Sequence, residues 1–219
     1  MVRGAPYARF DDRRAAGRIL AEQLHSYAGR DDVIVLGLPR GGVPVADEVA
    51  LALHVPLDVM LVRQLGVPGQ EELAFGAIAS GGVRILNVDV VAAAHLSPEQ
   101  ISGITAEQHL ELHRRERLYR GPDAPLELSG RTAIIVDDGL ATGATMRAAV
   151  EAVRQRDARP VVAAPVGAGP TCDALVDSAD AVICTITPEP FIAVGVWYRD
   201  FTPTADEEVI ELLALARRR

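Results

Sequence analysis

The sequence predicts an α/β protein built on an open, mostly parallel sheet with helices on both faces. Apolar, β-branched runs of strand length recur along the chain, at residues 33–37, 57–62, 132–136, 160–166 and 179–186. Continuous runs of this kind are typical of strands buried on both faces. Segments with helical spacing lie between most of the runs, which is the alternation of a doubly wound sheet.

The first part of the chain contains a complete strand–helix–strand unit. Residues 11–28 carry apolar side chains at helical spacing and predict the first helix. A strand at 33–37, a sharp loop at 38–42, a helix at 43–53 and a strand at 57–62 follow. This order predicts a right-handed parallel crossover.

Two segments then interrupt the alternation. Residues 63–86 are rich in glycine, and we expect a flexible loop followed by a hairpin of residues 74–79 and 83–86. Residues 97–120 begin with a capping-box pattern and a proline, so they predict a long inserted helix. Its dense charge and weak apolar face favour a helix that is solvated or faces another subunit.

The alternation resumes after residue 130. Helices are expected at 146–153 and 170–177, strands at 160–166 and 179–186, and a terminal helix that ends near Arg217. Composition shows no internal boundary, so residues 1–219 are expected to form a single domain with a small cap near the C-terminus.

Bulk properties narrow the possible function classes. The net charge of −8 argues against non-specific nucleic-acid binding, which needs clustered cations. No stretch is long and apolar enough to cross a bilayer, and no secretion signal is visible. Two lone thiols with structural roles, Cys172 and Cys184, suit a reducing compartment. We therefore expect a cytoplasmic protein with neither a nucleic-acid nor a membrane partner.

The most informative segment is residues 132–145. Its apolar strand ends in Asp137 and Asp138, and a loop of small residues and threonines then opens a helix. Free backbone N–H groups and the positive end of the helix dipole favour a phosphate at such a loop. Ionised carboxylates accept hydrogen bonds and bind hard cations, so the pair suits ribose hydroxyls or a Mg²⁺-bound sugar.

This segment resembles the motif by which type I phosphoribosyltransferases bind phosphoribosyl pyrophosphate (PRPP). The shared pattern is an apolar strand, two acidic residues, two variable residues and a small-Thr-Gly-x-Thr loop. The resemblance implies the fold of that family and makes Asp137 and Asp138 catalytic residues that hold the ribose hydroxyls. It also implies Mg²⁺ as cofactor, bound through PRPP, with both aspartates as candidate ligands. The residues implied to wrap the 5′-phosphate are Ala141, Thr142, Gly143, Ala144 and Thr145.

Two further segments fit this resemblance. Arg40, Gly41 and Gly42 lie between a strand end and a helix start, where the family binds pyrophosphate. The glycines expose backbone N–H groups, and the arginine can meet two phosphate oxygens. Arg63 begins the glycine-rich segment, where the family has a mobile loop, so it is a candidate catalytic residue that stabilises departing pyrophosphate. The segment lacks a lysine, which departs from the family pattern.

Aromatic residues gather near the C-terminus, where the family has a hood that recognises the acceptor. The resemblance assigns residues 187–203 to this hood, and Phe191, Trp197 and Tyr198 to an acceptor pocket. Their order, together with the Arg40 and Arg63 segments, is similar to that of an uncharacterised bacterial subgroup of phosphoribosyltransferases.

The resemblance implies Mg²⁺-dependent transfer of the 5-phosphoribosyl group from PRPP to a nitrogenous, nucleobase-like acceptor by a homodimer. Purines, pyrimidines, other heterocycles and amines all stay open as acceptors. An alternative of the same fold is a non-catalytic regulatory protein that senses PRPP or a nucleotide. A receiver domain also pairs acids at a strand end, but its pair follows the first strand. No Walker-type P-loop sequence occurs.

Overall fold

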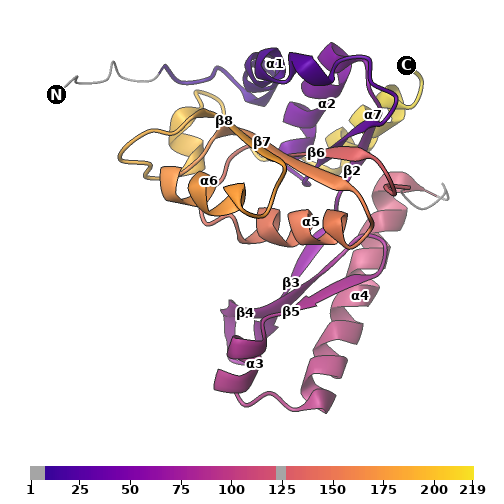
Figure 1. Cartoon of the computed structure of the whole chain (residues 1–219), viewed down its shortest axis with the longest axis vertical. Helices are drawn as coiled ribbons and strands as arrows, with labels where there is room; N and C mark the ends of the chain where they lie inside the picture. The colour runs from indigo at the N-terminus through magenta and orange to yellow at the C-terminus, as the bar shows by residue number, and fades with distance from the viewer. Residues whose placement is uncertain (1–7, 122–126) are drawn as a thin grey trace.

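The computed structural model describes residues 8–121 and 127–219 (Figure 1). Its centre is a five-stranded sheet in which every neighbouring pair of strands is parallel. The strand order is β2 (Leu57–Val59), β1 (Val33–Gly37), β6 (Thr132–Val136), β7 (Arg159–Val166) and β8 (Ala181–Ile186). This sheet confirms the predicted α/β class.

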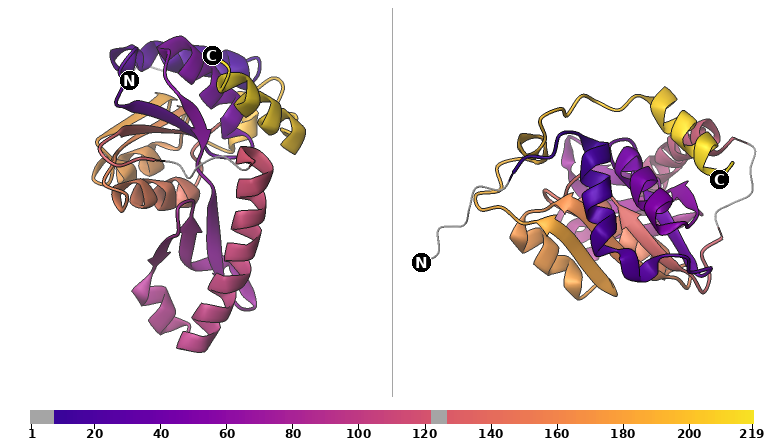
Figure 2. Two further views of the ribbon diagram at one scale, coloured as in Figure 1. Left: turned by 90° about the vertical axis from the view of Figure 1, so that its right-hand side faces the viewer. Right: turned by 90° about the horizontal axis from the view of Figure 1, so that it is seen from above.

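Helices cover both faces of this sheet (Figures 1 and 2). One face carries α1 (Arg13–Gln23), α2 (Gly42–Leu53) and α7 (Asp206–Ala216), and the other carries α5 (Ala144–Arg154) and α6 (Gly169–Val176). Side chains alternate along a strand. Val33 and Val35 therefore join the core under α1 and α2, while Ile34 and Leu36 join the core under α5.

A second, antiparallel sheet forms the core of an arm that projects from the first (Figures 1 and 2). Its strands are β3 (Val62–Val67), β4 (Gln70–Ala79) and β5 (Val83–Leu86), followed by α3 (Val88–Ala93). The predicted hairpin of β4 and β5 is confirmed. The flexible loop expected before it is wrong, because β3 and the first half of β4 pair there.

Glycine is the reason that the sequence of β3 resembles a loop. The β3–β4 register shifts around Gly66, and a Cβ built there would lie 2.5 Å from the carbonyl oxygen of Glu71. A bulge with such close backbone approach requires glycine. The flanking Leu65 and Val67 are buried in the main core, which anchors the strand.

The inserted helix α4 (Pro98–Arg120) begins with the predicted capping box, in which Ser97 and Gln100 bind each other's backbone N–H groups. The expectation of a solvated helix needs correction. Leu112 and Tyr119 are buried in the main core, where α4 packs on β3, β4 and α7. The opposite face is solvated, and Leu110 keeps 74% of its surface exposed.

The remaining predictions agree with the structure at most positions. α2, α5, α6, β7 and β8 begin and end within two residues of the expected bounds, and α7 ends at Ala216. The strand expected at 57–62 ends at Val59, and the first helix ends at Gln23 before a short 3₁₀ turn, η1 (His25–Tyr27). Among the described residues, no helix has the length and apolar character needed to cross a bilayer.

Candidate functional site

The two predicted phosphate-type loops meet at the carboxyl ends of β1 and β6, which are neighbouring strands of the sheet. The register pairs Gly37 with Val136, so the loops that follow these strands lie side by side. The first loop leads into α2, and the second, which contains Asp137 and Asp138, leads into α5. Ligands of open α/β sheets bind in crevices at this edge.

Glycines in the first loop allow the two loops to touch. A Cβ at Gly42 would lie 2.6 Å from the carbonyl oxygen of Val136 and 2.9 Å from the Cα of Asp137. A Cβ at Gly41 would overlap the carboxylate of Asp138. Any side chain at these positions would therefore displace the acidic pair.

Asp137 faces a cavity of about 150 Å³ that is lined by the loop leading into α5. Its carboxylate accepts a hydrogen bond of 2.9 Å from the backbone N–H of Asp138. Burial, and then the charge of Asp138, raise the pKa of Asp137 well above its ordinary value. A carboxylate in this setting gains from a cation or from hydroxyl donors that enter the cavity.

The other walls of this cavity suit an anion. Gly143 has a left-handed φ of 70° and caps α5 without a side-chain hydrogen bond, so backbone N–H groups of the first turn are available. Thr142 and Thr145 are exposed beside it. The hydroxyl of Thr171 donates a 2.6 Å hydrogen bond to the carbonyl of Ala141 and holds the outer side of the loop. These features fit a phosphate.

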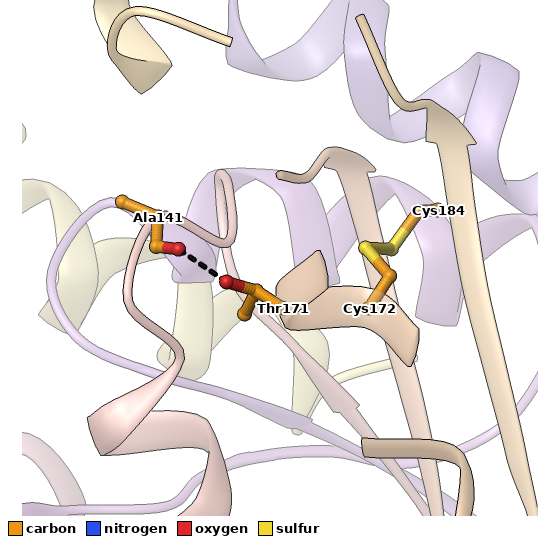
Figure 3. The surroundings of a disulfide bond; sticks show 4 residues. All are labelled: Ala141, Thr171, Cys172 and Cys184. Atoms are coloured by element: carbon orange, nitrogen blue, oxygen red, sulfur yellow. Dashed lines mark hydrogen bonds between the residues drawn. A yellow bond between two sulfur atoms is a disulfide. The ribbon is translucent and has the colours of Figure 1, made fainter. Parts of the chain in front are cut away.

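A disulfide lies next to the hydrogen bond between Thr171 and Ala141 (Figure 3). Cys172, next to Thr171 at the start of α6, is bonded to Cys184 on β8. This corrects the expectation of two lone thiols and removes the argument from free thiols for a reducing compartment. A separation of 12 residues does not by itself predict that the two cysteines pair. The disulfide depends on α6 packing beside β8.

Asp138 faces away from the cavity, toward α1. Both Nε and Nη2 of Arg13 lie 2.8 Å from its Oδ2 atom. Burial raises the pKa of Asp138, and the Arg13 guanidinium opposes this rise. Arg13 also donates to the carbonyl of Thr202 at 2.8 Å and lies 3.9 Å from the centre of the Phe201 ring. No sequence pattern indicates Arg13, which is 125 residues away from Asp138.

The three aromatic residues predicted to form an acceptor pocket have different environments. Tyr198 is only 3% exposed, and its hydroxyl donates a 2.6 Å hydrogen bond to the carbonyl of Asp138. Its burial, with the nearby acidic pair, raises its pKa. Tyr198 therefore supports the acidic pair from the core, which corrects its predicted role. Phe191 and Trp197 are half-buried, and the Trp197 indole donates to the Phe191 carbonyl at 2.9 Å.

Arg40 is exposed, with Nη1 3.9 Å from Oδ1 of Asp206 at the start of α7. The same oxygen accepts a 2.6 Å hydrogen bond from the hydroxyl of Tyr119 on α4. Burial and this hydrogen bond raise the pKa of Tyr119 to about 12. Arg40 is thus connected to α4 through Asp206.

Arg63 lies on a strand and not on a mobile loop. Its guanidinium donates two hydrogen bonds, of 3.0 and 2.7 Å, to the side-chain oxygen of Gln108 on α4. It also borders a recess that includes Pro39 of the first loop and Thr145 of the second. The structure therefore places Arg63 beside this recess, on strand β3 and not on a mobile loop.

Comparison with known proteins identifies the family of the chain. The model of the phosphoribosyl transferase domain matches residues 9–199, which include both loops and Arg63. The chain belongs to this family. A Mycobacterium tuberculosis (strain H37Rv) protein named "Putative phosphoribosyl transferase" is 52% identical over 211 residues, which are 95% of this chain and 47% of that protein. The chain thus spans about half the length of the curated relatives it matches most fully.

Two further comparisons add to this picture. The bifunctional protein PyrR of Roseiflexus sp. (strain RS-1) is 30% identical over 150 residues, covering 65% of this chain and 59% of that protein. The crystal structure of TT1426 from Thermus thermophilus has a TM-score of 0.83 at 42% identity, covering 94% of this chain and 97% of that one.

Proposed function

We propose that this phosphoribosyltransferase transfers the 5-phosphoribosyl group of PRPP to a nitrogenous, nucleobase-like acceptor and releases pyrophosphate. The observation that carries the proposal is that Asp137 and the loop from Gly139 to Met146 line the same cavity. One cavity thus offers a carboxylate for ribose hydroxyls and a helix start for the 5′-phosphate.

Mg²⁺ fits the donor set of this site. Carboxylate oxygens are the ligands that Mg²⁺ prefers, and it usually takes one or two of them together with water and substrate phosphates. Asp137 faces the cavity, and Arg13 engages one oxygen of Asp138. Within the described residues, no group of three or more His, Cys, Asp or Glu side chains could hold a metal alone. The ion would therefore be shared with PRPP, whose departing pyrophosphate it would neutralise.

The residues of the chain would act mainly by positioning and electrostatics. Asp137 would hold the ribose as positive charge develops on it, and the loop from Ala141 to Thr145 would fix the 5′-phosphate. Arg40 and Arg63 would offer cations to the leaving pyrophosphate. Phe191 and Trp197 are the hood rings that we propose for the acceptor. We also propose that the protein acts as a homodimer, which light scattering can test.

Pyrophosphate release from Mg·PRPP tests this function directly. The assay uses purines, pyrimidines, other nitrogen heterocycles and amines as separate acceptor sets, with wild type and an Asp137→Asn variant. We expect release with one acceptor class and a loss of about 100-fold in the variant, which is the usual effect of removing one transition-state contact. Release that is equal in the two proteins would contradict the assignment.

One observation favours the regulatory alternative, in which PRPP or a nucleotide is bound and not turned over. Arg13 already neutralises Asp138, so one carboxylate of the pair is engaged before any ligand binds. Saturable binding of Mg·PRPP without release of pyrophosphate in any acceptor set would support this alternative over catalysis.

A further inference from the structure

A second arginine lies beside Arg63, contributed by the inserted helix α4. Arg63 and Arg115 line a recess together with Pro39 of the first loop and Thr145 of the second. The other lining residues are apolar: Leu38, Met60, Leu61, Val62 and Leu112. The recess is small, about 30 Å³, so it marks the point where the two arginines and the two loops converge, and its remaining walls are largely apolar.

One face of α4 organises this region. Gln108, Leu112, Arg115 and Tyr119 follow each other at spacings of four, three and four, which places them on the same side of a helix. Gln108 binds the guanidinium of Arg63, and Leu112 is buried at 1% exposure. Tyr119 binds Asp206, the neighbour of Arg40. This face therefore carries Arg115, binds Arg63 directly and reaches Arg40 through Asp206.

Arg115 pairs with Glu111, but this carboxylate is shared with a second arginine, Arg114. The Nε atom of Arg115 donates a 2.8 Å hydrogen bond to Glu111, and Arg114 shares the same carboxylate at 2.7 and 3.0 Å. These two guanidiniums lower the pKa of Glu111 to about 2. A guanidinium has five donors, so one bond leaves most of them for a ligand. Glu111 with its two arginines therefore carries a net positive charge.

We propose that Arg115, together with Arg63, binds the pyrophosphate end of PRPP, so that the inserted helix supplies part of the pyrophosphate site. This inference rests on the proposed function. The sequence contains no lysine, so a long-chain side-chain cation at pyrophosphate must be an arginine. The recess adjoins Pro39, next to Arg40, whereas the 5′-phosphate is assigned to the backbone N–H groups at the start of α5. Arginine pairs also suit the adjacent oxygens of a diphosphate.

The test compares Arg115→Gln with Arg114→Gln as a matched control. Both arginines bind Glu111, but only Arg115 lines the recess. Each protein is titrated calorimetrically with Mg·pyrophosphate and, separately, with ribose 5-phosphate. We expect Arg115→Gln to weaken pyrophosphate binding by about tenfold or more, the usual effect of losing a charge-assisted hydrogen bond. Ribose 5-phosphate affinity should be unchanged, and Arg114→Gln should match wild type with both ligands.

Several results would overturn the inference. Wild-type pyrophosphate affinity in Arg115→Gln, or an equal loss in both variants, would remove Arg115 from the site and leave the proposed function intact. A selective loss of ribose 5-phosphate affinity would place the recess at the other end of PRPP. A folded wild type that binds neither ligand would contradict the proposed function itself. Arg115→Lys, which keeps the charge, should recover part of the affinity and guards against an effect of helix disruption.

Discussion

At the scale of single residues, the two neighbouring carboxylates point in different directions. Asp137 lines the cavity of the phosphate-type loop, and Asp138 binds Arg13. Burial raises the pKa of both. A raised pKa means that the folded protein binds the proton more tightly than the unfolded chain, so ionisation of these groups costs stability as pH rises. Such a cost is consistent with carboxylates retained for binding a ligand.

Replacement of Asp137 by asparagine should stabilise the free protein at pH values above the raised pKa, where the wild-type carboxyl is charged. The amide oxygen still accepts the hydrogen bond from the Asp138 N–H, and the buried charge is removed. We expect a gain of about 1–3 kcal/mol, the usual cost of a poorly compensated buried polar group. The gain should shrink as pH falls below the raised pKa, because the wild-type carboxyl is then protonated. Melting temperatures from acidic to alkaline pH provide the measurement, and a variant whose stability relative to wild type does not rise with pH would contradict it.

Replacement of Arg13 by glutamine should raise the pKa of Asp138 further, because the guanidinium that opposes the effect of burial is lost. The two side chains are 11% and 15% exposed, so the loss of the pair should also cost about 1–3 kcal/mol of stability. PRPP affinity measured against pH should move its midpoint upward. Arg13→Lys should recover only part of the effect, since lysine cannot place two nitrogens on one oxygen. A midpoint identical to that of wild type would count against this role.

At the scale of elements, the disulfide connects the start of α6 to β8 behind the phosphate-type loop (Figure 3). Its reduction should lower the free energy of unfolding by about 2–3 kcal/mol, the value for a loop of this length. Thiol titration of the denatured protein should find no reactive thiol before reduction and two afterwards. A Cys172→Ala, Cys184→Ala variant should not respond to reductant. Two reactive thiols in protein that was never reduced would rule out the disulfide.

Elements were predictable where the local pattern carried the information. Apolar runs indicated β1 and β6, and the loop into α5 had a recognisable spacing. β3 was hidden because Gly66, Pro68 and Gly69 resemble a loop, although a bulge and a tight turn need such residues. α4 appeared solvated because its packed face includes the polar Gln108 and Arg115. The contact between Arg13 and Asp138 could not be predicted from local sequence, because only the folded structure brings α1 close to the end of β6.

At the scale of the whole molecule, the site is assembled from distant parts of the chain. α1 supplies Arg13, the loops after β1 and β6 supply the centre, β3 of the arm supplies Arg63, and α4 beside the arm supplies Arg115. The arm is fixed at its base by Arg120, which is buried and binds both the carboxylate of Asp58 and the carbonyl of Val59 on β2. The central sheet and the arm therefore meet at the carboxyl edge of the sheet, where the proposed substrate binds.

Calorimetric titration of Mg·PRPP into wild type and Asp137→Asn is the most direct test of this assembly. Asp177→Asn, which changes an exposed carboxyl at the end of α6, serves as the control. We expect saturable binding by wild type and by the control, and an affinity lower by about tenfold or more in Asp137→Asn, because a charge-assisted contact is lost. Full affinity in Asp137→Asn, or no binding by folded wild type, would contradict the assignment of this cavity to PRPP.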